Sequence, residues 1–385
     1  MLKINKMSDG LRDRLGQLKT LQGSIQTPFF MPDATYGFVK LLNSEELNKI
    51  KVQGIVVNTL HLSLRPGIKI IKKAGGIHNF INWLGLILSD SGGYQIFSLI
   101  HRNPRMGKIY DRGAVFKSPL DGSKKELTPK KSIQIQFDLG VDAMVCLDDC
   151  PPNEYNNKDL EKSVIRTIRW AKECRLEYDR QVKERKLKDN QRPLLFAVIQ
   201  GGENLDLRKE CAQELIKIGF DGYGFGARPV DQEGKFLNKV LEYTANLIPD
   251  KAIRFALGIG LPEDIVKCAK MGWDMFDCVI PTREGRHGKL FFFQKKSNLQ
   301  IPNCKFQIAS NFYKTININN AKFARDFLPV NPDSKILELR KYSKAYLHHL
   351  FKLKEPLGQR LASLNNLEFF IDLMKEIRNN IKGSS

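Results

Sequence analysis

Short apolar segments recur along the chain, separated by turn residues and longer charged stretches. Near-continuous apolar runs occupy residues 54–58, 86–90, 142–148, 194–200 and 255–260. Apolar runs of this length without polar alternation are typical of parallel strands that are covered on both faces. Each run is therefore predicted to be a buried strand.

Helical spacing of apolar residues marks the segments between several of these runs. Residues 158–186 are the longest such segment, with apolar positions at Leu160, Val164, Ile168, Ala171 and Leu176. Residues 206–218 form a second predicted helix, and Pro262 opens a third because proline suits the first helical turn. Alternating strands and helices predict a parallel α/β fold.

Polar residues end three of these apolar segments, namely Asp90, Asp148 and Gln200, and Asp277 ends a further short apolar run. A barrel collects the carboxyl ends of its strands at one face, so we expect a (β/α)8 TIM barrel in preference to an open sheet. Residues 1–290 are predicted to form the barrel that carries the active site. Residues 291–385 lack this alternation of strands and helices and have a helical pattern from about Ser343. They are expected to pack on the barrel as a C-terminal helical appendage.

Positive charge is the strongest compositional signal. The chain has 62 Lys and Arg against 42 Asp and Glu, a net charge of +20, and residues 281–385 hold 19 against 8, or +11. Solvated surface lysines are one interpretation, and a polyanionic partner is the other. No segment resembles a membrane span, a lipid-type amphipathic face or a signal-peptide core. A cytoplasmic protein that binds nucleic acid is therefore expected.

Two aspartates are candidates for covalent or acid–base chemistry. Asp277 lies among the apolar residues 276–280. A buried carboxylate is expected either to pair with a charged or hydrogen-bonding group or to have a functional role. It is either a salt-bridged residue at a strand end or a nucleophile for an anomeric carbon. Asp90 precedes Ser91-Gly92-Gly93 and is either a turn residue or a second reactive carboxyl. Tyr94 is either packed or stacked on a planar base.

Further polar groups suit the recognition of a base. Asp148 and Asp149 follow an apolar run and either begin a loop or accept hydrogen bonds from the N–H edge of guanine. Gln200 precedes Gly201-Gly202, and its amide suits another base edge. The basic cluster that begins at Arg283 suits a phosphate backbone. Together these residues predict chemistry on a nucleic acid.

Several long motifs resemble the tRNA-guanine transglycosylase family. They are Ser-Asp-Ser-Gly-Gly-Tyr-Gln at 89–95, Asp-Asp-Cys-Pro at 148–151, Gln-Gly-Gly at 200–202, Phe-Asp-Gly-Tyr at 220–223, the segment 274–283, and the segment 342–350. The resemblance runs in order from about residue 10 to the C-terminus. It implies an irregular (β/α)8 barrel that exchanges guanine at the wobble position of a tRNA anticodon for a 7-deazaguanine, queuine or preQ1.

The resemblance also implies roles for individual residues. Asp277 would be the nucleophile that forms a covalent aspartyl-ribosyl intermediate, and Asp90 the acid/base group. The base would be bound by Tyr94, Asp148, Gln200, Gly201, Ala227 and Leu257, and the anticodon loop by Thr282, Arg283 and Arg286. A homodimer is a possible assembly.

The chain departs from the family where a zinc ion is expected. The three cysteine positions of the family fall on Ser334, Ile336 and Leu339, and the histidine position falls on Asn365. None of these is a thiolate or imidazole ligand, and no cysteine follows Cys304. We therefore expect no structural zinc and no other cofactor, with apolar packing in place of the metal.

The base-pocket loop is a second departure. Residues 224–232 place Arg228 and Pro229 where the family has a glycine-rich pattern, so the incoming base is left open. Alternative functions are a related enzyme that acts on DNA, one that hydrolyses a free 7-deazaguanine nucleoside for salvage, or a non-catalytic RNA-binding partner subunit. The presence of both Asp277 and Asp90 argues against the last alternative, and the basic C-terminal region favours a polymer.

Overall fold

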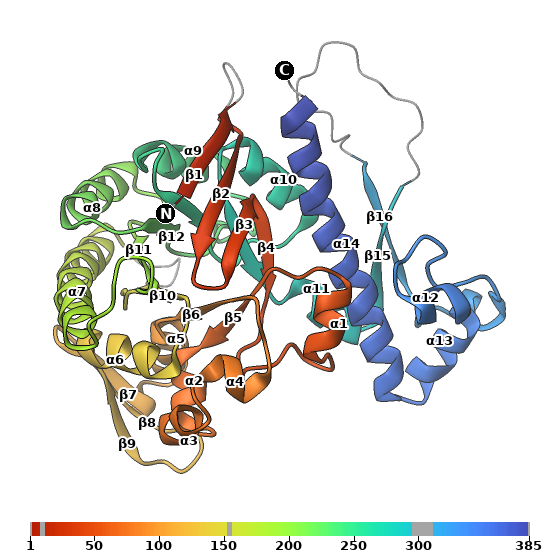
Figure 1. Cartoon of the computed structure of the whole chain (residues 1–385), viewed down its shortest axis with the longest axis horizontal. Coiled ribbons are helices and arrows are strands. Elements are labelled where there is room, and N and C mark those ends of the chain that lie inside the picture. The colour runs from red at the N-terminus through yellow and green to blue at the C-terminus, as the bar shows by residue number, and fades with distance from the viewer. Residues whose placement is uncertain (1, 8–11, 152–155, 295–310, 384–385) are drawn as a thin grey trace.

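An eight-stranded parallel sheet forms the centre of the computed structural model, which describes residues 2–7, 12–151, 156–294 and 311–383 (Figure 1). An isolated parallel bridge between Asp33 and Val56 brings the two edge strands together, so the sheet is a nearly closed barrel. The predicted barrel fold is confirmed. In spatial order the strands are β4 (Phe29–Pro32), β14 (Met275–Cys278), β13 (Ile253–Ala256), β12 (Gly222–Phe225), β11 (Leu194–Ile199), β10 (Ala143–Val145), β6 (Leu86–Asp90) and β5 (Gly54–Asn58).

Most predicted elements agree with the observed ones, and two strands differ at their ends. β5 and β6 have the predicted bounds. The run at 142–148 is a strand only over Ala143–Val145, and the residues up to Asp148 leave the sheet. The run at 255–260 starts two residues earlier than predicted and stops at Ala256, since Gly258 turns the chain with a φ of +71°. Both corrections lengthen the loops at the carboxyl ends of the strands.

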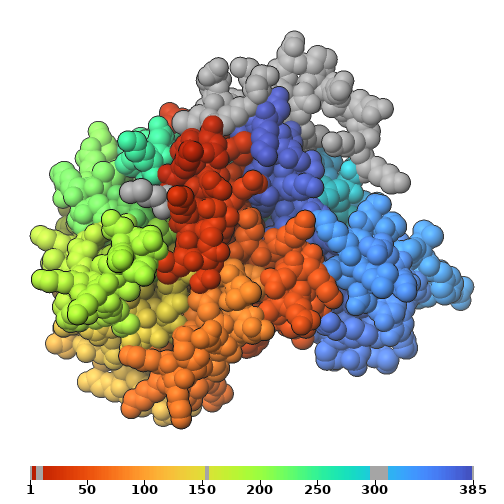
Figure 2. Space-filling view, in the orientation of Figure 1, coloured from red at the N-terminus to blue at the C-terminus, as the bar shows by residue number. Residues whose placement is uncertain are grey.

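The amino-terminal end of the barrel is closed by an antiparallel sheet of β1 (Leu2–Met7), β2 (Arg14–Thr20) and β3 (Gly23–Thr27). Leu18 and Ile25 of this sheet pack into the apolar interior of the barrel. Figure 2 shows the N-terminal residues, in red, over the middle of this face. Functional groups are consequently confined to the opposite end, where the strands finish.

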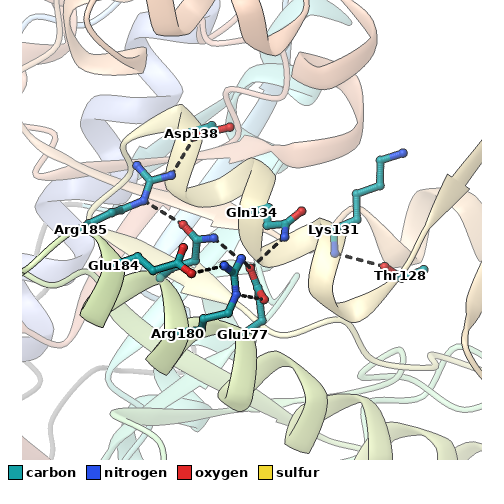
Figure 3. Close-up of polar contacts among 9 residues, drawn as sticks. Thr128, Lys131, Gln134, Asp138, Glu177, Arg180, Glu184 and Arg185 are labelled. Atoms are coloured by element: carbon teal, nitrogen blue, oxygen red, sulfur yellow. Dashed lines mark hydrogen bonds and ion pairs between the residues drawn. The ribbon is translucent and has the colours of Figure 1, made fainter.

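Helices surround the barrel, and ion pairs connect neighbouring ones (Figure 3). Glu177 of α7 (Asn157–Glu184) accepts hydrogen bonds from Gln134 of α6 (Pro129–Leu139) at 2.9 Å and from Arg180 at 2.8 Å. Arg185 reaches back to Asp138 of α6 at 2.8 Å. The helices up to α10 are α1 (Ser44–Lys49), α2 (Thr59–Leu64), α3 (Ile68–Lys73), α4 (Ile77–Ile81), α5 (Gly93–Arg102), α6 (Pro129–Leu139), α7 (Asn157–Glu184), α8 (Leu205–Ile218), α9 (Asn238–Leu247) and α10 (Pro262–Lys270).

A small antiparallel sheet is inserted between α5 and α6. It consists of β7 (Gly107–Tyr110), β8 (Gly113–Lys117) and β9 (Lys124–Leu127), preceded by the 3-10 turn Pro104–Met106. The three strands lie beside α6 at the lower left of Figure 1. Because α6 is the helix that leads into β10, the insertion belongs to the connection that starts at the carboxyl end of β6.

The C-terminal part packs along the outside of the barrel. It contains α11 (Ile280–Arg286), β15 (Lys289–Phe293), β16 (Tyr313–Asn317), a 3-10 turn at Ala321–Arg325, α12 (Leu337–Lys341), α13 (Lys344–Lys352) and α14 (Pro356–Gly383). The side-chain amide of Asn366 in α14 donates to the carbonyl oxygens of Pro281 at 3.0 Å and Lys289 at 2.9 Å. Ser343 caps α13, which begins close to the residue where the helical pattern was expected to start. Within the described ranges, every helix is too short or too polar to cross a membrane.

Candidate active site

Polar side chains gather at the carboxyl ends of four barrel strands. Asp90 is the last residue of β6, Asp277 lies in β14, Gln200 directly follows β11, and Asp148 comes three residues after β10. Parallel strands in a barrel all end at the same face. The structure thus brings together the four residues that the sequence placed at strand ends.

Asp90 is held by donors from three neighbouring segments. Its carboxylate accepts hydrogen bonds from the Asn58 amide at 2.7 Å, the Gln95 amide at 3.2 Å and the Gly92 backbone N–H at 3.1 Å. Burial raises the pKa of Asp90 to about 7 even though these donors favour the charged form. The carboxyl is therefore held in one orientation, and its raised pKa makes the protonated form accessible near neutral pH.

Asp277 has fewer donors and lies near other carboxylates. The backbone N–H of Gly258 donates to it at 2.9 Å. Burial raises the pKa of Asp277 to about 7, and the negative charges of Asp33 and Asp90 act in the same direction. Two neighbouring carboxyl groups that titrate near neutrality permit one to be ionised while the other holds a proton. That arrangement suits a nucleophile paired with a general acid.

A second polar group lies beside this pair. The Gln200 amide donates to the Asp148 carboxylate at 2.7 Å, and its own Oε1 atom is buried without a partner among the described residues. Burial raises the pKa of Asp148 to about 7 and that of the Cys150 thiol to about 12. A buried acceptor without a donor is costly unless a ligand satisfies it. A flat molecule with several N–H donors would satisfy both groups.

Asp149 has a different environment from its neighbour. Arg166 of α7 forms an ion pair with the Asp149 carboxylate, and the Asp149 backbone N–H donates to Thr167 Oγ1 at 3.0 Å. Ser163 Oγ donates to the Asp149 carbonyl at 2.7 Å. The two adjacent carboxylates therefore separate, with Asp148 facing Gln200 and Asp149 anchored to α7.

The remaining base-binding candidates lie on the loops around this group. Tyr94 is in the first turn of α5 and is 54% exposed. Leu257 follows β13 and packs against Gly224 of β12. Gly201 has a φ of +137° and lies against the Arg208 backbone, while Ala227 adopts a left-handed φ of +82° beside Cys150. Few residues other than glycine tolerate such a φ, so the Ala227 position is strained.

The three predicted RNA-contact residues differ in exposure. The Nη1 atom of Arg286 is buried without a hydrogen-bond partner among the described residues. Arg283 is half exposed and lies 3.5 Å from Glu284. Thr282 is only 4% exposed, and its hydroxyl donates to the Val279 carbonyl at 3.3 Å. Of these three residues, Arg286 is therefore the one best suited to bind an anion.

The positions that correspond to zinc ligands hold groups that do not fit the metal. Ser334 Oγ donates to Glu368, and the Asn365 amide donates to the Phe291 carbonyl at 3.0 Å. Ile336 and Leu339 are buried apolar residues. A structural zinc site needs thiolate or imidazole donors, and these four side chains offer neither. Cys304 lies outside the described residues.

Four residues of the site were not singled out from the sequence. Asn58 and Gln95 bind Asp90, Asp33 adds negative charge next to Asp277, and the Cys150 thiol is near Gln200. Asn58 and Asp33 share one signal with the predicted residues, because each stands at the end of a short apolar strand. Gln95 and Cys150 lie within quoted motifs, yet only the fold shows what they contact.

The fold and the site define a class of protein. A barrel with three carboxyl groups of raised pKa at its catalytic end, one of them buried and two partly buried, has the layout of a TIM-barrel enzyme. Comparisons with known proteins narrow this class. The family model described as queuine tRNA-ribosyltransferase matches residues 9–385.

Relatives named queuine tRNA-ribosyltransferase resemble nearly the whole chain. One from Halothermothrix orenii is 42% identical over 96% of this chain and 91% of its own length. Others from Anoxybacillus flavithermus and Staphylococcus aureus are each 40% identical over 96% of this chain and 89% of theirs. The chain belongs to the queuine tRNA-ribosyltransferase family.

Proposed function

We propose that this protein exchanges guanine at the wobble position of a tRNA anticodon for a 7-deazaguanine base. The observation that supports this proposal most is the pair of partly buried carboxyls of raised pKa, Asp277 and Asp90, at the same end of the barrel as the Asp148–Gln200 group. The first pair suits cleavage of a glycosidic bond, and the second suits the N–H edge of guanine. Relatives over nearly the full chain bear the name of this activity.

In the first half-reaction, an ionised Asp277 oxygen attacks C1′ of the ribose. The new bond is an ester between Asp277 and C1′, and the bond that breaks is the one from C1′ to N9 of guanine. Asp90, whose raised pKa makes its protonated form accessible near neutral pH, supplies the proton that the departing guanine needs. The hydrogen bond from Gly258 keeps the Asp277 carboxylate oriented for attack.

In the second half-reaction, the incoming base takes the position that guanine left. Asp148 and Gln200 hold its N–H edge through the same contacts. The ionised Asp90 accepts the proton from N9 as that nitrogen bonds to C1′. The ester bond breaks, and Asp277 returns as a carboxylate. The reaction is reversible for guanine because entering and leaving bases use the same groups.

The target nucleotide must leave the base stack to reach the two partly buried carboxyls of Asp90 and Asp277, as enzymes that act on bases require. A base in a single-stranded loop is cheaper to extrude than a paired one. Arg286, with its unpartnered buried Nη1 beside Asp33, is positioned to grip a flanking phosphate. Tyr94 is exposed at the rim and is available to stack on a base.

Incubation with radiolabelled guanine and unmodified tRNA tests the proposal. We expect label to enter the tRNA and not duplex DNA, and a denaturant-stable protein–tRNA adduct to form. Label in DNA, or hydrolysis of a free 7-deazaguanine nucleoside without exchange, would assign the site to another substrate. Binding of tRNA without any exchange would identify a partner subunit instead.

Three accompanying features are proposed on the same basis. The chain works without a structural zinc, because Glu368 and Asn365 organise the segment around Ser334 through hydrogen bonds. Residues 1–290 act as the catalytic barrel, and residues 291–385 as a subdomain that supports it. The protein acts in the cytoplasm, and a homodimer is a possible assembly by the family resemblance.

A further inference from the structure

The inserted sheet of β7, β8 and β9 lies on the catalytic side of the barrel. It is part of the connection that begins at Asp90, the last residue of β6, and ends where α6 begins at Pro129. Connections that start at the carboxyl ends of barrel strands form the face that holds the active site. A partner bound in the site is therefore within reach of this sheet.

Arg166 anchors the inserted sheet to the rim of the base site. Its guanidinium forms an ion pair with Asp149, the neighbour of Asp148, and lies 3.6 Å from Asp111 in the turn between β7 and β8. The indole N–H of Trp170 also donates to the Asp111 carbonyl at 2.7 Å. These contacts hold the sheet in a fixed position relative to the base site.

One face of the sheet is basic and the other is buried. Ala114, Phe116 and Leu127 point inward and are buried. The residues that alternate with them point outward, since successive side chains of a strand face opposite sides. The exposed residues Lys108, Tyr110, Lys117, Lys124 and Glu126 lie on this outer surface, which we name the basic sheet face because three of them are lysines and one is acidic. Residues 102–131 hold nine Lys and Arg against three Asp and Glu, a net charge of +6.

Two lysines of the basic sheet face lie directly opposite each other. Lys117 of β8 is the cross-strand partner of Lys124 in β9. Like charges in such a pair destabilise a sheet. Among the described residues neither lysine has an ion-pair partner within 4.0 Å, because Glu126 lies 3.6 Å from Arg112 and Asp111 lies near Arg166. The fold tolerates this repulsion, and an external anion would relieve it.

An aromatic ring accompanies these cations. Tyr110 is 42% exposed, and the Lys108 ammonium lies 5.5 Å from its ring centroid. Lysines with an interleaved exposed aromatic are the usual composition of a surface that follows a nucleic-acid backbone. A membrane surface is less compatible, since the face lacks the apolar residues that insert among lipids.

We propose that the basic sheet face binds backbone phosphates of the tRNA outside the nucleotide that enters the active site. This inference rests on the proposed function and extends it, because it assigns a second contact region to the same substrate. The two regions have different roles. The residues at the carboxyl ends of the barrel strands select the base, and the basic sheet face adds binding affinity that is independent of the RNA sequence.

The test is a double substitution, Lys117→Gln with Lys124→Gln, in the full-length protein. A matched control is Lys188→Gln with Lys251→Gln, since both are exposed residues that precede the amino ends of β11 and β13. Both variants lose two positive charges, but only the first loses them on the catalytic side. Dissociation constants for tRNA are measured by gel shift over a salt series, and exchange rates are measured at saturating tRNA.

The salt dependence sets the expected size of the effect. Each lost phosphate contact lowers the slope of log K against log salt by about 0.7 to 0.9, so two contacts lower it by roughly 1.4 to 1.8. Extrapolated from about 1 M to about 0.1 M salt, this corresponds to binding that is roughly 25- to 60-fold weaker. The exchange rate at saturating tRNA should stay unchanged. The melting temperature should not fall, since the substitutions remove a repulsive pair of charges.

An unchanged slope and affinity in the Lys117/Lys124 variant would overturn the proposal. Equal weakening in the Lys188/Lys251 control would also overturn it, because the effect would then reflect overall charge. Binding is measured without catalysis, so the outcome is separate from that of the proposed function. A wild-type protein that binds tRNA through this face but exchanges no guanine would refute only the reaction.

Discussion

Replacement of Asp277 by asparagine should abolish exchange and, at alkaline pH, stabilise the protein. The wild-type carboxyl has a pKa of about 7, raised from an ordinary value of 3.8 mainly by burial. At pH 8 folding must therefore bury a charge that asparagine does not carry. The Gly258 N–H, which donates to Asp277 Oδ1, retains an acceptor in the asparagine side chain.

The pKa shift sets the magnitude and the sign. Between the unfolded pKa and about 7, the folded protein binds more protons than the unfolded chain, so the stability contributed by this group falls as pH rises. The loss is complete above the folded pKa. A shift of about three units corresponds to at most ~4 kcal/mol, and we expect about 1–3 kcal/mol because burying the asparagine amide has a desolvation cost of its own. Near pH 4 the variant and the wild type should differ little.

Urea unfolding at pH 5, 6, 7 and 8 measures this dependence, and a control should show the opposite sign. Burial raises the pKa of Asp138, but its ion pairs with Arg185 and Lys72 lower it on balance. Asp138→Asn should therefore destabilise the protein at neutral pH. Exchange by Asp277→Asn should fall by at least ~10³-fold, with no adduct. An Asp277→Asn protein that is less stable than the wild type at pH 8, or that still traps tRNA, would refute the reasoning.

Three further predictions concern RNA, base and metal. Arg286→Ala should lower the slope of log K against log salt by about 0.7 to 0.9 if its unpartnered Nη1 binds a phosphate, and an unchanged slope would remove it from the interface. Gln200→Leu should raise the KM for guanine by roughly tenfold, since a hydrogen bond of about 1–1.5 kcal/mol is lost, whereas an unaltered KM would contradict the base-binding role. Metal analysis should find well under one zinc per chain, and a chelator should leave the melting temperature unchanged. A stoichiometric zinc bound by sulfur or nitrogen would overturn the assignment of Ser334 and Asn365.

Local patterns predicted the fold well. The apolar runs that became β5 and β6 and the helical spacing in 158–186 each require a partner surface, and only a few architectures provide it. The predicted carboxyl ends of β10, before Asp148, and of β13, before Gly258, were less accurate. Each strand ends where the loop conformation turns the chain away and where the neighbouring strand no longer provides hydrogen-bond partners. Local hydrophobicity predicts neither of these.

Residue type and place at a strand end were enough to identify Asp90, Asp148, Gln200 and Asp277 as candidates, because parallel strands bring such residues to one face. Which carboxylates act together was decided by the tertiary structure. Asp148 faces Gln200, 52 residues further along the chain, while its neighbour Asp149 forms an ion pair with Arg166 on α7. The basic sheet face likewise depends on the strand register that places Lys117 opposite Lys124. The composition of a chain determines its net charge. The burial of each ionisable side chain and its distances to other groups, which set pKa values and binding, are determined only when segments that are distant in sequence pack together.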